Sequence, residues 1–124
     1  MKRRVLLALR LMSPVDRLFS VGAALSRRMD AELEVLADPE HPDWAGIGMR
    51  LSALSRSDLV CHLTPMPGID ARQVVEYARD HEYVVSVVVG RPAAWNNEAS
   101  NNQWALLECP LVAASDHPAH PREE

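Results

Sequence analysis

Glycine is scarce in this chain, and its distribution is informative. Only five of the 124 residues are glycine, and none follows Gly90. Gly90 comes directly after residues 84–89, a run that is apolar except for Ser86 and is of the kind that forms a strand buried on both faces. A phosphate-binding loop after such a strand needs further glycines, because its backbone N–H groups must approach the phosphates closely. The strand therefore favours a nucleotide-binding fold, while the loop after it argues against an ordinary phosphate site.

Cysteine, excess positive charge and long apolar runs are also lacking. Cys61 and Cys109 lie far apart in apolar contexts, which favours reduced thiols over a disulfide. The net charge of −4 gives no reason to expect nucleic acid. The apolar run at residues 5–9 ends at Arg10, too early for a secretion signal or a membrane span. We therefore expect a cytoplasmic protein that binds neither nucleic acid nor membrane.

The chain shows no metal motif and no catalytic motif. Its five histidines lack the spacing of a metal site. Cys61 and His62 are neighbours in a predicted strand, so their side chains point to opposite faces. No Gly-x-Ser-x-Gly elbow is present, and neither cysteine has an evident activating base. We predict no cofactor, no metal and no catalytic residue.

Apolar runs alternate along the chain with segments of helical periodicity. Strands are predicted at residues 5–9, 33–37, 59–63, 84–89 and 111–114. Helices are predicted from Ser13-Pro14, along Trp44 to Leu54, after a cap at Asp70, and over residues 100–108. This alternation predicts one α/β domain over residues 1–115, with a parallel sheet between two helical layers. Residues 116–124, rich in proline and acids, are predicted to be a disordered tail.

Several local signatures occur in a meaningful order. The strand at residues 4–9 precedes Ser13-Pro14, the segment Val75-Glu76-Tyr77-Ala78 precedes the strand that ends at Gly90, and Cys109-Pro110 precedes the last strand. Together they resemble the universal stress protein family, within the adenine nucleotide alpha hydrolase-like group of folds. The resemblance implies a doubly wound, five-stranded parallel sheet in the order 3-2-1-4-5.

Two departures from that family concern its nucleotide site. Arg10 stands where nucleotide-binding members usually have an Asp at the end of the first strand. Of their glycine-rich motif only Gly90 remains, with Ala93 in the place of the second glycine. The resemblance therefore implies a degenerate nucleotide-binding site that does not bind ATP in the usual way.

The implied strand order brings the ends of the first and fourth strands together, where ligands bind in such sheets. Arg10, Gly90 and Arg91 would then line one crevice, and two guanidinium groups would attract phosphate or carboxylate. The alternative is a pair of exposed loop arginines. Trp95 and Trp104 could stack on bases, but we favour packing of these indoles against the sheet.

The last strand is predicted to lie at the sheet edge. Its apolar residues Leu111, Val112, Ala113 and Ala114 would leave backbone groups open for pairing. Family members often dimerise through this strand, so the resemblance implies a homodimer. The alternative is an edge covered by the tail.

These observations favour a stress-response domain that regulates or binds an unidentified protein partner and is not an enzyme. The first alternative is a sensor of a small anionic ligand or nucleotide in the crevice between strands one and four. The second is an enzyme acting on adenine nucleotides, which would lack the backbone donors that stabilise transition-state charge.

Overall fold

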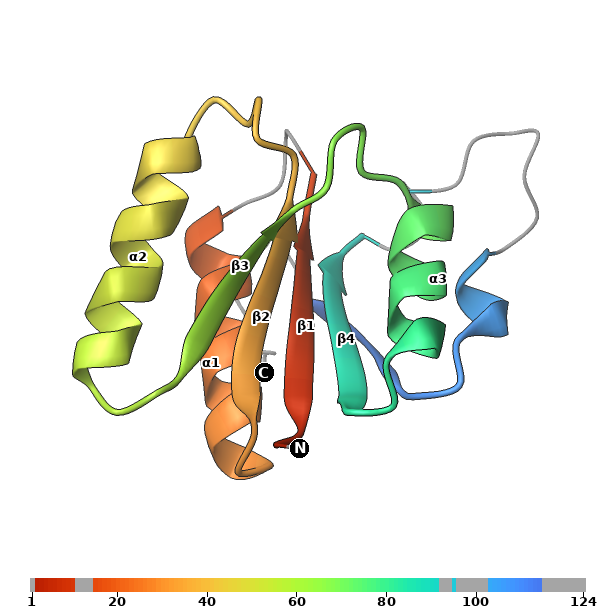
Figure 1. Ribbon diagram of the computed structural model, residues 1–124, viewed down its shortest axis with the longest axis horizontal. Coiled ribbons are helices and arrows are strands. Elements are labelled where there is room, and N and C mark those ends of the chain that lie inside the picture. The colour runs from red at the N-terminus through yellow and green to blue at the C-terminus, as the bar shows by residue number, and fades with distance from the viewer. Residues whose placement is uncertain (1, 11–14, 92–94, 96–102, 115–124) are drawn as a thin grey trace, which may run out of the picture.

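The computed structural model describes residues 2–10, 15–91, 95 and 103–114. These residues form a single five-stranded parallel sheet in the order β3-β2-β1-β4-β5, flanked by helices (Figure 1). The predicted α/β class and strand order are confirmed. The elements in chain order are β1 (Arg4–Leu9), α1 (Val15–Arg28), β2 (Glu32–Ala37), α2 (Trp44–Arg56), β3 (Cys61–Pro65), α3 (Ala71–Asp80), β4 (Val84–Gly90), the 3-10 helix η2 (Gln103–Leu106) and β5 (Leu111–Ala114).

Strand β1 lies at the centre of the sheet and is buried on both faces. Alternate side chains Val5, Leu7 and Leu9 pack into one core, with residues of α1 and α2. Leu6 and Ala8 pack into the other, with residues of α3 and η2. Because both faces are covered, the strand is a continuous apolar run rather than an alternating one.

The helices form two layers because each right-handed crossover places its helix on one face of the sheet, and the face depends on the side toward which the next strand is added. Helices α1 and α2 cover one face, and α3 and η2 cover the other (Figure 1). The predicted cap of α3 is confirmed. Asp70 Oδ1 accepts from the Gln73 backbone N–H at 2.8 Å, and Gln73 Oε1 accepts from the Asp70 backbone N–H at 3.1 Å. This capping box satisfies two backbone donors that the helix leaves open at this end.

The largest differences from the predicted boundaries are at the last helix and at β3. In place of a last helix over residues 100–108, the described part shows only η2, followed by bends at Glu108 and Cys109. Pro110 disfavours helical backbone at the residue before it. Strand β3 starts at Cys61 rather than residue 59, because the Leu59 N–H donates to the Leu54 carbonyl and closes the end of α2. The predicted Ser13-Pro14 helix start, Ala93 and the predicted tail lie outside the described residues.

Candidate functional site

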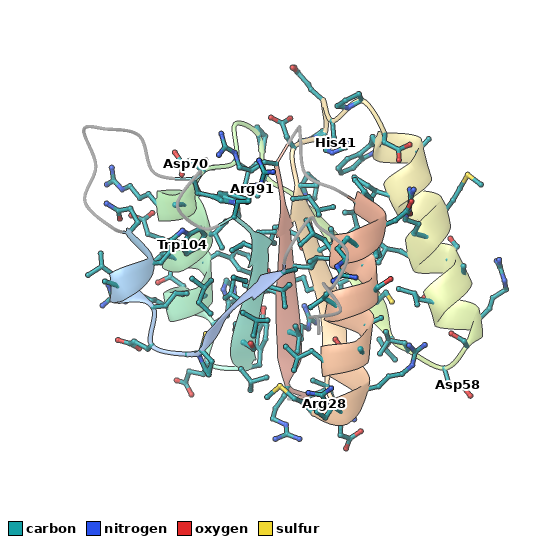
Figure 2. All side chains as sticks on the ribbon, turned by 180° about the vertical axis from the view of Figure 1, so that it is seen from behind. Arg28, His41, Asp58, Asp70, Arg91 and Trp104 are labelled. Atoms are coloured by element: carbon teal, nitrogen blue, oxygen red, sulfur yellow. The ribbon has the colours of Figure 1, made fainter. Side chains whose placement is uncertain are left out.

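The candidate site lies at the carboxyl edge of the sheet, between β1 and β4. The strand order reverses at this point, since β2 and β4 lie on opposite sides of β1. Arg10 follows β1 and Arg91 follows β4, so both predicted arginines extend from strands that pair directly. Open α/β sheets bind ligands at such a switch point. Figure 2 shows Arg91 at this edge.

Trp95 fills part of this edge. Its side chain is buried, with 6% of its surface exposed, and its Nε1 donates to the Gly90 carbonyl oxygen at 3.1 Å. The Trp104 ring packs edge-on against it, with 5.6 Å between centroids. The Arg10 guanidinium carbon lies 5.4 Å from the Trp95 centroid, within the range of a cation–π contact. The prediction that both indoles are packing residues is confirmed, and Trp95 also links Arg10 to the end of β4.

The backbone of Arg91 is unusual. Its φ of +48° places a residue with a long side chain in the left-handed region. This conformation costs a residue other than glycine roughly 1–2 kcal/mol, because its Cβ lies too close to the following carbonyl oxygen. Strained residues of this kind cluster at ligand sites and switch regions. Both Arg10 and Arg91 are exposed, and each also interacts within the protein. The two arginines make this edge basic, and the edge is constrained by an indole and by the left-handed backbone of Arg91.

Gly90 contributes its carbonyl group to the edge. A Cβ built at this position would lie 3.6 Å from the Leu18 side chain and 3.7 Å from the Ala114 carbonyl oxygen, which is ordinary van der Waals contact. The hydrogen atom that replaces a side chain here thus faces α1 and β5. Sterics do not demand glycine at this position.

Titratable groups elsewhere form pairs rather than a metal centre. Among the described residues, no three His, Cys, Asp or Glu side chains lie together as metal ligands would. His62 Nε2 lies 2.8 Å from Glu32 Oε1 across β2 and β3. Both cysteines are free, and burial raises the pKa of the Cys61 and Cys109 thiols. A raised pKa lowers the thiolate fraction and so the reactivity of both.

A buried carboxylate on β2 was not predicted from the sequence. Glu34 is fully buried, and its Oε1 accepts from Arg4 Nη1 at 3.0 Å. Its Oε2 accepts from Thr64 Oγ1 at 2.7 Å and from the Tyr77 hydroxyl. Burial raises the pKa of Glu34. The hydrogen bonds from Tyr77, Thr64 and Arg4 together lower that pKa by more than burial raises it, so the net shift is downward. Conversely, burial and the Glu34 carboxylate raise the pKa of Tyr77.

A sequence signal for this cluster did exist. Glu32 and Glu34 are two residues apart in a strand, so they share a face. His62 and Thr64 do the same on β3, and Glu34 is in register with His62. Two adjacent strands thus present polar side chains on one face, toward the side of α3.

The edge strand β5 pairs with β4 alone in the described part of the chain. The Val87 N–H donates to the Pro110 carbonyl oxygen at 3.0 Å, so the backbone of residue 110 faces β4. Because backbone direction alternates along a strand, the N–H of Val112 also faces β4, and those of Leu111 and Ala113 face outward. Leu111 and Val112 are half-buried, Ala113 is exposed and Ala114 is buried.

No helix within the described residues is long and apolar enough to cross a membrane. No protein-family model matches the chain, and no curated protein matches it.

Solved structures do match the fold. A universal stress protein from Archaeoglobus fulgidus aligns with a TM-score of 0.65 at 10% identity, over 92% of this chain and 99% of its own. UspA from Lactobacillus plantarum gives 0.63 at 15% identity, over 91% and 97% of the two chains. A universal stress protein in complex with cAMP gives 0.64 at 16% identity, over 94% and 98%. This chain therefore has the fold of the universal stress proteins.

Proposed function

We propose that this protein is a cytoplasmic regulatory domain of the stress response that binds a protein partner and has a degenerate nucleotide site. The observation that carries the proposal is the placement of Trp95. Its indole is buried at the switch point and holds the Gly90 carbonyl, while Arg10 lies over its ring. Structural neighbours include complexes with cAMP and dAMP. In this chain an indole takes up space at the switch point, where open α/β sheets bind ligands, and no glycine follows Gly90.

The same residues argue for binding rather than catalysis. Arginine guanidiniums donate hydrogen bonds and stay charged, so Arg10 and Arg91 can hold an anion but cannot act as a base. The Trp95 indole is a donor only, and its hydrogen is already used. We therefore propose that the protein is not an enzyme.

Thermal unfolding in the presence of ligands tests the degenerate site. We expect no shift in Tm with ATP, dAMP or cAMP. A ligand at about 100 times its Kd would stabilise the folded protein by about 2.7 kcal/mol, which raises the Tm of a domain of this size by several degrees. A saturable increase with any of these nucleotides would contradict the proposal.

A second candidate function is favoured by the strained Arg91 backbone beside a second arginine. In this case the edge senses a small anion such as phosphate or an organic acid, held by charge-assisted hydrogen bonds. The same melting series then shows a shift with small anions that Arg10→Gln and Arg91→Gln abolish. Arg56→Gln is the matched control, because Arg56 is also exposed but lies at the end of α2.

We also propose that two copies pair through β5 to form a homodimer. Ala113 is the position to substitute, because its N–H faces outward from the edge and not toward β4. Proline there removes an outward donor while leaving the bonds to β4 in place. We expect Ala113→Pro to change the mass measured by light scattering from that of a dimer to that of a monomer, and Ala113→Thr to remain dimeric.

The position of the substitution matters for this test. Proline at Val112 would remove a donor that faces β4 and would perturb the monomer itself. If wild-type protein is already monomeric, or if Ala113→Pro keeps the wild-type mass, the interface through β5 is wrong.

A further inference from the structure

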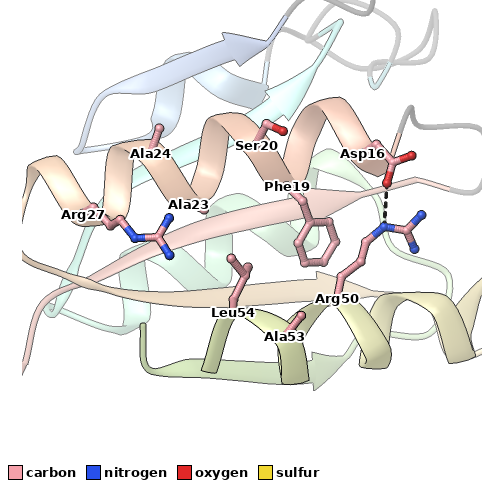
Figure 3. Close-up of a pocket in the computed structure, with 9 residues that line it drawn as sticks. All are labelled: Asp16, Phe19, Ser20, Ala23, Ala24, Arg27, Arg50, Ala53 and Leu54. Atoms are coloured by element: carbon pink, nitrogen blue, oxygen red, sulfur yellow. Dashed lines mark hydrogen bonds and ion pairs between the residues drawn. The ribbon is translucent and has the colours of Figure 1, made fainter. Parts of the chain in front are cut away.

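A groove runs between α1 and α2, away from the switch point. Its volume is about 510 Å³, within the range of pockets that hold small molecules. Figure 3 shows its lining, which comes entirely from these two helices. The lining residues are Asp16, Phe19, Ser20, Ala23, Ala24, Arg27, Arg50, Ala53 and Leu54.

Small side chains create the groove. Ala24 on α1 and Ala53 on α2 are exposed at its rims, where longer side chains would fill the space between the helices. Phe19 and Ala23 are buried beneath it, each with 5% of its surface exposed, and Leu54 is half-buried. The middle of the groove is therefore apolar, and an apolar body placed there would be removed from water.

The two ends of the groove differ in charge. At one end Arg50 is neutralised, because its Nε lies 2.7 Å from Asp16 Oδ1 and its Nη1 lies 3.0 Å from Asp43 Oδ2. At the other end Arg27 Nη2 donates to the Ser57 hydroxyl at 3.1 Å, and that hydroxyl donates to the Leu54 carbonyl at 2.9 Å. No carboxylate within the described residues forms an ion pair with Arg27. The neutral Ser57 hydroxyl thus positions Arg27 without an ion pair in the described part of the chain, and the carboxylates of Asp30, Glu32 and Asp58 line a separate cavity on its other side.

We propose that this groove binds a free medium-chain fatty acid, with its carboxylate on Arg27 and its acyl chain over Phe19 and Leu54. Charge complementarity sets the direction, because the exposed carboxylate of Asp16 would repel a second carboxylate at the other end. Arg27 comes eleven positions after Asp16 on α1, about 16 Å along the helix, which accommodates an extended chain. Binding in this groove does not depend on what binds at the carboxyl edge of the sheet.

Octanoate is the probe, used below its micelle concentration and followed by calorimetric titration. We expect saturable binding to wild-type protein, about tenfold weaker binding to Arg27→Gln, and little change with Arg27→Lys. Arg28→Gln is the matched control, since Arg28 is the exposed neighbour that does not line the groove. Ala53→Phe fills the groove and is expected to abolish binding.

Three results would overturn the proposal. The first is an absence of saturable octanoate binding to folded wild-type protein. The second is equal binding of octanoate by Arg27→Gln and Arg28→Gln, which would show that Arg27 does not hold the carboxylate. The third is equal binding of octanol and octanoate, which shows that the apolar groove acts without Arg27. Circular dichroism of each variant establishes that it is folded before titration.

Discussion

An Arg4→Met variant is expected to unfold at pH 7 with a free energy about 3 kcal/mol below that of the wild-type protein. Arg4 Nη1 donates to Glu34 Oε1 at 3.0 Å, and the Glu34 side chain is only 1% exposed. Removing the guanidinium leaves a buried carboxylate without its compensating charge. The Arg4 guanidinium also lies 4.8 Å from the Tyr83 ring centroid, a contact that methionine replaces only in part. Urea unfolding followed by circular dichroism measures the difference.

The loss is expected to depend on pH in a defined direction. Hydrogen bonds lower the pKa of Glu34 in the folded protein, so its contribution to stability is present above the ordinary glutamate pKa and fades as pH falls through the lowered value. Without Arg4 the folded-state pKa of Glu34 rises. The stability gap between the two proteins should therefore be largest near neutral pH and shrink as the pH falls through the ordinary glutamate pKa and below it.

Two control variants distinguish the stability effect of the buried Arg4–Glu34 pair from that of an ordinary surface ion pair. Arg72→Met removes an exposed i,i+4 pair in which Arg72 and Glu76 side chains are 75% and 61% exposed, and it should cost less than about 0.5 kcal/mol. Arg4→Met combined with Glu34→Gln removes both charges and should recover more than half of the loss. A gap below about 1 kcal/mol, or one that is unchanged by pH, would contradict the assignment.

Trp95→Ala is expected to lower the free energy of unfolding by about 3–4 kcal/mol. The substitution empties a buried site and removes the edge-on contact with Trp104, the hydrogen bond to Gly90 and the stacking of Arg10. Trp95→Phe retains an aromatic ring but not the Nε1 donor, so it should lose less. The same urea unfolding experiment measures all three proteins.

Trp44→Ala provides the comparison within the same chain. Trp44 is half-buried at the start of α2, so its truncation should cost less than half as much as that of Trp95. If the two alanine variants unfold at the same urea concentration, Trp95 is not the packing centre of the carboxyl edge. The proposed role of its indole at the switch point would then lose its main support.

The arrangement of elements was accessible from local patterns. The apolar run of β1 predicted a central strand because a parallel strand buried on both faces shows no alternation. Asp70 predicted a helix start because a carboxylate can accept from the open backbone donors of the first turn. The predicted last helix was less accessible, since residues 103–109, which the structure describes, form η2 and two bends instead.

The sites depend on contacts between distant residues, which local patterns do not encode. Glu34 meets Tyr77, 43 positions later, and Arg50 meets Asp16, 34 positions earlier. Whether a strand glutamate faces solvent or a guanidinium depends on which strands become neighbours. Periodicity and chain direction along the sequence were enough to predict the class of fold and the order of its elements. The burial of Glu34 with its partners, the hydrogen bond from Trp95 to Gly90 and the groove between α1 and α2 became visible only in the folded chain, because each depends on the distances between packed elements.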